Sequence, residues 1–371
     1  MQSSPLEARL AGLLAESRHW LLTNATRKLK IGVVFAMWGK QNRLCPKSAA
    51  NPTGEDSLVT KLEQLEWATL GTEVDWHLYA VDYGCPHGSD DIASEIADAH
   101  PLAERVTVLS LADALPAAEG PLRKLASADN SRKAGAAILG CDHALKAGAE
   151  AVISTDADNS VHLVQIGLLL RPYVEQATPV VLGDRKHAKS VLVKEAARWG
   201  IGIKVLRHMQ RMIGHAIFSR DILDTQAAFK LYGSELLSEI IADPTVFDFS
   251  FDTDWILAAL RKETSFEQTP FAFIDSAAES ASIAQGPMTT WETLLFGLIR
   301  SVRRHGFCTG NAAAMAEVVE QEINDYRDLE KIIDQLPPEL TSAGEADYGD
   351  PSVLSPEALR SWLHETIGVS R

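Results

Sequence analysis

The sequence has few cysteines and no long apolar stretch. Its four cysteines, Cys45, Cys85, Cys141 and Cys308, are scattered over 371 residues and form no Cys-x-x-Cys pair. This spacing argues against a zinc cluster or a disulfide framework and favours a reducing compartment. No run reaches the roughly 18 apolar residues that a membrane-spanning helix needs, and charges interrupt the first apolar positions, so we expect no signal peptide. We therefore expect a cytoplasmic protein that is soluble or at most peripheral to a membrane.

Positive charge is also scarce. Lys and Arg total 35 against 50 Asp and Glu, which gives a formal net charge of -15. This balance argues against nucleic acid as a partner and against general attraction to an anionic membrane. A ligand that carries phosphate would need a local pocket of cations or a bound metal. The sequence also lacks a Gly-x-Gly-x-x-Gly motif after any strand-like run, which argues against a dehydrogenase.

Short apolar runs alternate with longer helical patterns in the first half of the sequence. Runs that are apolar on both faces are typical of parallel strands covered by helices, so this half predicts an α/β fold. The predicted strands span 31–37, 74–81, 106–111, 151–155 and 179–182, and the predicted helices span 57–70, 90–99, 132–146 and 161–174.

We expect an amphipathic N-terminal helix, one main domain and a helical C-terminal region. These parts span residues 1–29, 30–285 and 286–371, with a linker near 337–354. Apolar residues at helical spacing predict one long helical stretch over 191–217 and another over 312–333. A strand is expected over 266–274.

Two carboxylates, Asp156 and Asp158, come directly after the predicted strand 151–155. In an extended chain residues i and i+2 point to the same side, so both can face one ligand. Ligands of open α/β sheets bind outside the carboxyl ends of the strands, where this pair falls. Bridged by Mg²⁺ or Mn²⁺, the pair can bind a nucleotide diphosphate and stabilise it as it departs. The alternative is that Asp158 or a neighbour caps the helix that begins near Val161.

Three further positions are candidates for nucleotide binding. Lys133, in the segment 130–135 before a predicted helix, can meet an anion together with free backbone N–H groups, or it can belong to an ordinary basic first turn. Arg185 follows a strand and can clamp a phosphate, or it can form a surface salt bridge. Asp82 ends another strand and can accept hydrogen bonds from a base or ribose, or it can serve turn chemistry alone.

These residues together resemble the inverting family-2 glycosyltransferases, nearest the branch that transfers glucose or mannose to polyprenyl phosphate. The segments that resemble family motifs, in order, are Val81-Asp-Tyr-Gly84, Asn130-Ser-Arg-Lys-Ala-Gly135, Thr155-Asp-Ala-Asp158, Gly183-Asp-Arg185 and Phe251-Asp-Thr-Asp254. The most specific match is Asp224-Thr-Gln-Ala-Ala-Phe-Lys230, which agrees with the family's Asp-Thr-Gln-x-Gly-Phe-Lys at five of seven positions. The resemblance covers about Ile31 to Ser280.

The resemblance implies a GT-A fold, which is a Rossmann-like, mainly parallel sheet with helices on both faces. It implies transfer of a hexose from a UDP- or GDP-sugar to a hydroxyl with inversion, with Mg²⁺ or Mn²⁺ held by Asp156 and Asp158. The residues implied for donor binding are Asp82, Lys133, Asp156 and Arg185. Those implied for the sugar and acceptor side are Asp224, Gln226 and Lys230. Either Asp252 or Asp254 would deprotonate the acceptor hydroxyl.

Several departures from the family bear on the substrate. The segment 34–39 lacks the Asn-Glu of the first family turn, Tyr83 replaces an acid, and Ala228 replaces a glycine, so base and sugar preferences stay open. The basic segment 289–307 can contact a membrane or pack against the main domain. We expect a small-molecule acceptor, with a lipid phosphate at the membrane surface as the alternative. Formation of a homo-oligomer stays open.

Two other functions compete with this hypothesis. The segment 39–47 after the first strand suggests a sugar-phosphate nucleotidyltransferase, although that class needs a glycine-rich turn and the segment has one glycine. A non-catalytic nucleotide-sugar-binding protein would keep Asp82 and Arg185. Such a protein would have no need of the acids on the acceptor side, which this sequence retains.

Overall fold

The computed structural model of the chain describes residues 5–25, 27–193, 200–275 and 287–368. The chain forms two compact units. The first comprises Met1–Lys194, Gln226–Asp248 and Glu263–Ala278, and the second comprises Glu195–Thr225, Phe249–Lys262 and Glu279–Arg371. Neither unit is therefore a continuous stretch of sequence.

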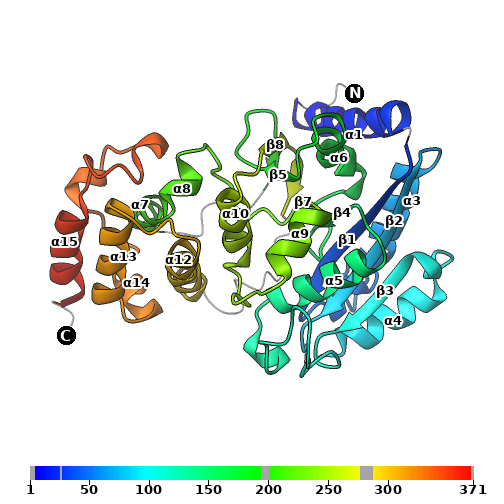
Figure 1. Cartoon of the computed structure of the whole chain (residues 1–371), viewed down its shortest axis with the longest axis horizontal. Helices are drawn as coiled ribbons and strands as arrows, with labels where there is room; N and C mark the ends of the chain where they lie inside the picture. The colour runs from blue at the N-terminus through cyan, green and yellow to red at the C-terminus, as the bar shows by residue number, and fades with distance from the viewer. Residues whose placement is uncertain (1–4, 26, 194–199, 276–286, 369–371) are drawn as a thin grey trace. The chain divides into compact units, whose positions relative to one another are not determined.

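A seven-stranded sheet forms the first unit, in the order β3-β2-β1-β4-β7-β5-β8 (Figure 1). Neighbouring strands are parallel, except that β7 is antiparallel to both β4 and β5. Its strands are β1 (Leu29–Met37), β2 (Val74–Asp82), β3 (Val106–Ser110), β4 (Ala151–Ser154), β5 (Val180–Asp184), β7 (Lys230–Gly233) and β8 (Phe266–Pro270). A separate parallel pair consists of β6 (Val191–Val193) and β9 (Ala272–Ile274).

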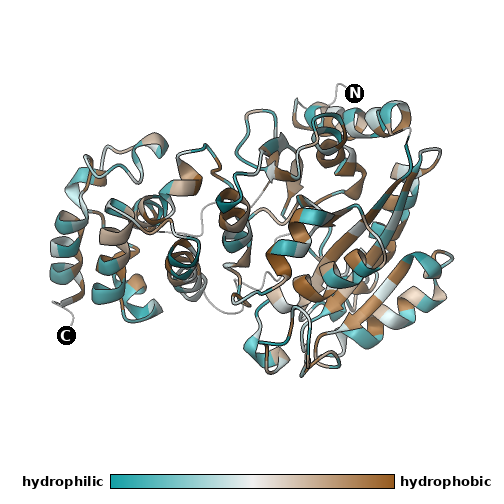
Figure 2. Ribbon diagram, viewed as in Figure 1, coloured by the Kyte–Doolittle hydropathy of each residue, from teal (hydrophilic) through white to brown (hydrophobic). Residues whose placement is uncertain are grey.

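Helices cover both faces of this sheet, and β1 is therefore buried on both sides. Ile31 and Val33 belong to one buried cluster with α1, α3, α4 and α6. Gly32 points the other way, and a Cβ there would lie 2.5 Å from the Ala144 Cβ, so the missing side chain lets α5 approach the strand closely. Figure 2 shows apolar strands between helices whose outer sides are polar. The helices are α1 (Pro5–Asn24), α2 (Gln41–Leu44), α3 (Ser57–Thr69), α4 (Ser89–Ala99), α5 (Ala134–Lys146), α6 (Ile166–Glu175) and α9 (Ser234–Ile241).

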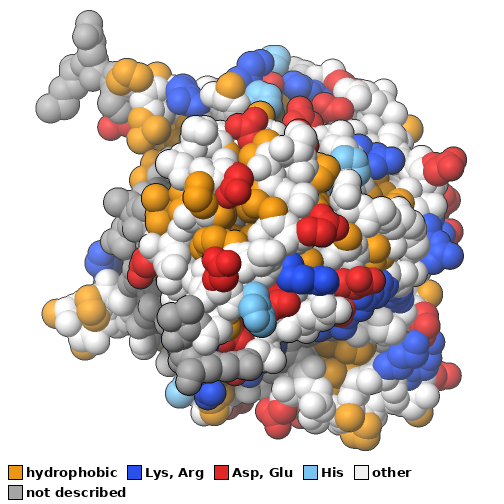
Figure 3. All heavy atoms as spheres, turned by 90° about the vertical axis from the view of Figure 1, so that its left-hand side faces the viewer, with side chains coloured by type: hydrophobic (Ala, Val, Ile, Leu, Met, Phe, Trp, Pro, Cys, Tyr) orange, Lys and Arg blue, Asp and Glu red, His pale blue; other side chains and the backbone are white. Residues whose placement is uncertain are grey.

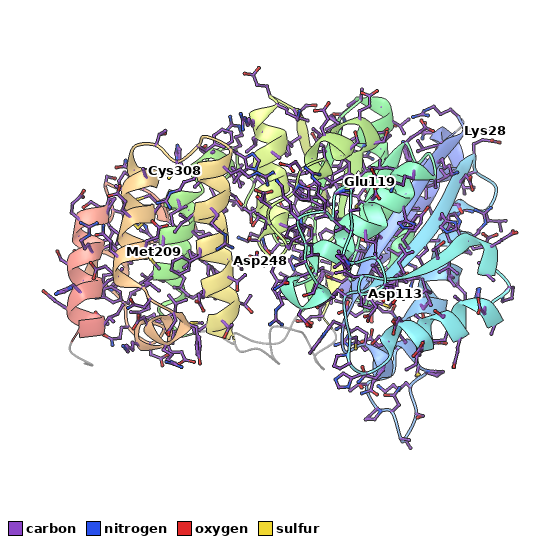
Figure 4. The ribbon with its side chains drawn as sticks, turned by 60° about the horizontal axis from the view of Figure 1, so that its bottom comes forward. Lys28, Asp113, Glu119, Met209, Asp248 and Cys308 are labelled. Atoms are coloured by element: carbon purple, nitrogen blue, oxygen red, sulfur yellow. The ribbon has the colours of Figure 1, made fainter. Side chains whose placement is uncertain are left out.

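The described part of the second unit is built of helices. Helix α12 packs against α7, α10 and α14, and its apolar positions Leu295, Ile299 and Val302 are at most 1% exposed. Met209 of α7 is buried, and α7 packs against α12 and α13 (Figure 4). The helices are α7 (Ile203–Ile213), α8 (His215–Phe218), α10 (Phe251–Arg261), α12 (Pro287–Arg304), α13 (Asn311–Glu322), α14 (Tyr326–Ile332) and α15 (Pro356–Gly368).

The apolar face of α12 therefore packs against other helices of its own unit, of which α7 and α10 lie within residues 30–285 and α14 lies outside them. Within the described residues, no helix combines the length and the apolar character needed to cross a bilayer. The molecular face drawn in Figure 3 carries acidic, basic and hydrophobic side chains side by side.

The predicted α/β fold is confirmed, and the five strands and four helices predicted for the first half all form. The helix predicted over 191–217 is wrong at its start, because Val191–Val193 forms β6 and pairs with β9; residues 194–199 lie outside the described residues. The helix predicted over 312–333 is broken, because Asp325 accepts a hydrogen bond from the Arg327 N–H and caps a new helix. The strand predicted over 266–274 divides into β8 and β9.

Close packing of α5 on the sheet gives a test of the fold. A Cβ at Gly140 would lie 2.5 Å from Val34 Cγ1, so Gly140→Ala should lower the free energy of unfolding by about 1–3 kcal/mol. The same change at Gly12 of α1 meets nothing within 4 Å and should raise it by up to about 1 kcal/mol. Urea unfolding measures both. Equal stability of the two variants would contradict this packing.

Candidate active site

The carboxyl ends of four strands meet at one edge of the main sheet. Strand β1 leads to Lys40, and β2 ends at Asp82. Strand β4 leads to Asp156, and β5 leads to Arg185; these two strands share a direction because both are antiparallel to β7. Strand β7 begins at this edge with Lys230. The sheet thus gathers charged side chains where open α/β sheets bind ligands.

Asp156 is held by Lys133. The Lys133 Nζ lies 2.8 Å from Asp156 Oδ1, and the two side chains are 22% and 30% exposed. Burial by itself raises the pKa of Asp156, but the charges of Lys133, Arg185 and Lys40 outweigh it and lower that pKa to about 2. The carboxylate is therefore ionised at physiological pH and has the form that a hard divalent cation binds.

Asp158 is held by its own loop and by Arg43. Its Oδ1 accepts hydrogen bonds from the hydroxyl and the N–H of Ser160, and its Oδ2 lies 3.5 Å from the Arg43 guanidinium. The alternative that Asp158 or a neighbour caps the next helix is wrong. The cap of the short helix η3 (Leu163–Gln165) is His162, which accepts a hydrogen bond from the Val164 N–H.

Lys133 adopts an unusual backbone conformation at the start of α5. Its φ of 74° and ψ of -44° lie near the classic γ-turn, which is strained for a residue with a side chain. The expectation of free N–H groups in 130–135 is wrong for at least four of these residues, since the N–H groups of Asn130 and Ser131 donate to the carbonyls of Ser127 and Ala128. The Arg132 N–H donates to Phe247 O and the Gly135 N–H to Ser131 Oγ. What this segment offers the site is chiefly the Lys133 ammonium.

Asp82 lies at the end of β2 and is 1% exposed. Its Oδ1 accepts hydrogen bonds from the N–H groups of Gly84 and Cys85, both at 2.8 Å. Its Oδ2 is buried and has no hydrogen-bond partner among the described residues. Burial raises the pKa of this carboxyl, against the two backbone hydrogen bonds. A buried acceptor without a partner is costly, and a donor group of a ligand would satisfy it.

Two aromatic rings lie next to Asp82. Tyr83 stacks on Trp38, which follows β1, with centroids 6.5 Å apart and planes inclined by 20°. Burial raises the pKa of Tyr83 to about 12, so its hydroxyl keeps its proton. Flat aromatic surfaces of this kind suit a nucleobase. No motif in the sequence pointed to Trp38, and its only signal was its position directly after the first strand.

Residues 40–61 fold back onto the loop that carries Asp158. The Arg43 guanidinium pairs with Glu55 at 2.6 Å, and the other Glu55 oxygen accepts a hydrogen bond from the Asn159 N–H. Lys61 donates from Nζ to the Asp158 carbonyl at 2.5 Å. Arg43 and Lys61 are almost completely buried. In the sequence, residues 39–47 of this region suggested only a nucleotidyltransferase, and no motif pointed to Lys61 or Glu55.

The remaining donor- and acceptor-side candidates are distributed over both units. Arg185 lies over the Phe273 ring at 5.1 Å. Lys230 is completely buried, and its Nζ donates to the Ala227 carbonyl. Gln226 is half-buried in the first unit, whereas Asp224 is buried in the second.

Asp252 and Asp254 lie in the first turn of α10, in the second unit. Both are buried. The two Asp254 oxygens pair with Arg304 at 3.2 Å and with His305 at 2.9 Å. Residues i and i+2 of a helix do not share a face, so these two acids cannot both turn to one ligand.

The fit of a divalent metal rests on the carboxylate pair. No group of three or more His, Cys, Asp or Glu residues in the described ranges is arranged to hold a metal ion. Mg²⁺ is usually bound by one or two carboxylates together with substrate phosphates. Asp156 and Asp158 therefore fit a metal that is bound jointly with a diphosphate, and they do not form a complete protein cage.

A cavity of about 910 Å³ lies in the second unit, between α7, α8, α13 and the segment 345–351. Aromatic and aliphatic side chains line it together with Arg211 and Glu345. None of the predicted site residues lies in its wall.

The fold is similar to that of solved glycosyltransferase structures, although no protein-family model matches the sequence. Glucosyl-3-phosphoglycerate synthase from Mycobacterium tuberculosis in complex with phosphoglyceric acid aligns with a TM-score of 0.50 and 13% identity, over 84% of this chain and 88% of that chain. A structure described as a mycobacterial protein aligns with a TM-score of 0.51 and 14% identity, over 80% of each chain. The synthase with Mn²⁺, UDP-glucose and phosphoglyceric acid has a TM-score of 0.48 at 12% identity, over 84% and 87%. The first two alignments confirm the predicted GT-A fold.

Lys61→Met should raise the free energy of unfolding at pH 7. Burial lowers the pKa of Lys61 to about 8 from 10.5, although Asp158 and Asp156 oppose this shift. Because of this shift, the buried ammonium lowers the free energy of unfolding by on the order of 3 kcal/mol. In the variant, loss of the hydrogen bond to the Asp158 carbonyl offsets about 1 kcal/mol of the gain. This cost is complete below pH 8 and disappears as the pH rises to 10.5, so the advantage of the variant should shrink over that window.

Urea unfolding in EDTA at pH 7 and pH 10 measures the effect. Lys47→Met, at an exposed position of the same segment, is the control and should stay within about 0.5 kcal/mol of the unchanged protein. An advantage of Lys61→Met that grows with pH would contradict the assignment.

Proposed function

We propose that this protein is a metal-dependent glycosyltransferase that transfers a hexose from a nucleotide-diphosphate sugar to a hydroxyl acceptor. The observation that supports this most directly is the carboxylate pair Asp156 and Asp158. It follows a central strand of a GT-A sheet and is surrounded by cations. A metal ion held by carboxylates beside cationic side chains would stabilise the negative charge of a departing diphosphate.

The donor would extend along the carboxyl edge of the sheet. Asp82, with its buried oxygen, would accept a hydrogen bond from the nucleoside, and the rings of Trp38 and Tyr83 would flank the base. Lys133 and Arg185 would bind phosphate oxygens. Asp156 and Asp158 would hold Mg²⁺ or Mn²⁺, which supplies Lewis-acid stabilisation of the leaving diphosphate.

A small anionic acceptor is the best-supported substrate class. The synthase of similar fold was crystallised with phosphoglyceric acid, and another of its structures holds Mn²⁺ and UDP-glucose. The basic helix α12, the candidate for contact with a membrane, has its apolar face covered by other helices. We therefore favour a small soluble acceptor over a polyprenyl phosphate, and a protein that works in the cytoplasm.

Asp252 is our candidate for the base. Asp254 is occupied by Arg304 and His305, which suits a structural role. In a single displacement, Asp252 would take the proton of the acceptor hydroxyl while the diphosphate leaves from the opposite face of the sugar, and the anomeric configuration would invert.

A thermal-shift screen of UDP-, GDP- and dTDP-sugars with and without Mn²⁺ tests donor binding. At least one donor should raise the melting temperature, with a larger rise when Mn²⁺ is present, because a ligand that binds only the folded state stabilises it. Asp156→Ala should remove the increment due to Mn²⁺ without loss of the fold. Asp243→Ala, which removes an exposed acid paired with Arg123, is the matched control. No stabilisation by any donor would refute the proposal.

The two acids of α10 should respond differently to replacement by Asn. Asp252→Asn should lower kcat about 10²- to 10⁴-fold, because an amide cannot take the proton of the acceptor hydroxyl. Asp254→Asn should lower the melting temperature, because it removes the buried carboxylate that pairs with Arg304 and His305. Turnover of a sugar donor and thermal unfolding separate the two effects. Full activity of Asp252→Asn would exclude it as the base.

A sugar-phosphate nucleotidyltransferase is the second candidate, because Arg43 of the segment 39–47 lies beside Asp158. Release of pyrophosphate from a nucleoside triphosphate and a sugar phosphate would favour that function over glycosyl transfer.

A further inference from the structure

An unusual number of cations surrounds the carboxylate pair. Lys40 and Lys61 each interact electrostatically with Asp156, Asp158 and Glu55. Arg43 pairs with Glu55 and Asp158, and Lys133 and Arg185 act on Asp156. The members of this cation cluster are Lys40, Arg43, Lys61, Lys133 and Arg185. Five cations thus face three carboxylates in a protein whose net charge is -15.

Two of the five cations are buried and held in place. Lys61 is completely buried and Arg43 is 1% exposed. Lys61 is fixed by its hydrogen bond to the Asp158 carbonyl, and Arg43 by its ion pair with Glu55. Lys40 is half-buried after β1 and can reach a ligand at the sheet edge. The positive field is therefore a permanent property of the folded unit.

The cations also remove the usual obstacle to binding a diphosphate. Two adjacent carboxylates repel phosphate, and a divalent metal normally overcomes that repulsion. Here Lys133 lies on Asp156 at 2.8 Å and Arg43 lies near Asp158 at 3.5 Å, so protein charges already offset both acids. The excess of two positive charges matches the two negative charges of a nucleotide-diphosphate sugar. Buried and half-buried charges are screened little by salt.

We propose that the cation cluster is a diphosphate subsite that binds the donor without a divalent cation, so that the metal is required for transfer and not for donor binding. This inference rests on the proposed function, and it separates what donor binding requires from what transfer of the sugar requires. The segment 40–61 contributes Lys40, Arg43 and Lys61 to the subsite, and Lys133 and Arg185 complete it.

Calorimetric titration of UDP, GDP and dTDP tests the subsite in EDTA and in Mn²⁺. At least one nucleotide should bind in EDTA with an affinity within about tenfold of its affinity in Mn²⁺. Lys40→Met should weaken binding in EDTA by about fivefold to tenfold, since it removes one nearby charge, and should weaken binding in Mn²⁺ less. Lys47→Met removes a charge from an exposed position of the same segment and should leave both affinities unchanged.

The outcomes separate this inference from the function on which it rests. Binding in Mn²⁺ but not in EDTA would overturn the subsite and leave the glycosyltransferase proposal standing. No binding under either condition would overturn both. An equal effect of Lys40→Met and Lys47→Met would mean that only the overall charge matters, and it would overturn the subsite. Circular dichroism of each variant ensures that a loss of affinity is not a loss of fold.

Discussion

The candidate site depends on a mutual compensation between buried cations and carboxylates. Lys61 and Arg43 are cut off from water, and a buried charge is strongly destabilising unless it has a partner. Glu55, Asp158 and the Asp158 carbonyl supply those partners. The same contacts fix the loop after β4, which carries both acids of the pair. The buried Lys61, which lowers the free energy of unfolding, therefore also helps to fix the loop of the proposed diphosphate subsite.

The sheet topology decides which residues take part in this compensation. Parallel strands β1, β2, β4 and β5 bring their carboxyl ends to one edge, and the antiparallel β7 contributes its amino end. Helix α5 packs closely on β1 because Gly32 and Gly140 lack side chains. This approach places Lys133, in its strained conformation, next to Asp156. Features of the site that look local thus require the packing of the whole first unit.

The two acidic pairs differ because they lie in different types of secondary structure. Asp156 and Asp158 follow a strand, where alternate residues point to one side. Asp252 and Asp254 lie on a helix, where residues two apart diverge. Asp254 is accordingly turned to Arg304 and His305. The same i, i+2 spacing therefore suits joint metal binding in one place and separate roles in the other.

The sequence by itself determined the strands and helices of the first half, the GT-A class and the location of Asp82, Asp156 and Arg185 at strand ends. These follow from periodicity and short motifs, which are local. It did not predict that Lys61 and Glu55, about a hundred residues before their partners, close onto the Asp158 loop, or that Val191–Val193 forms a strand. Tertiary structure decided those features. A lysine in a helical pattern is expected to be exposed to water, whereas folding buries Lys61 and bonds it to the Asp158 carbonyl, which is distant in the sequence.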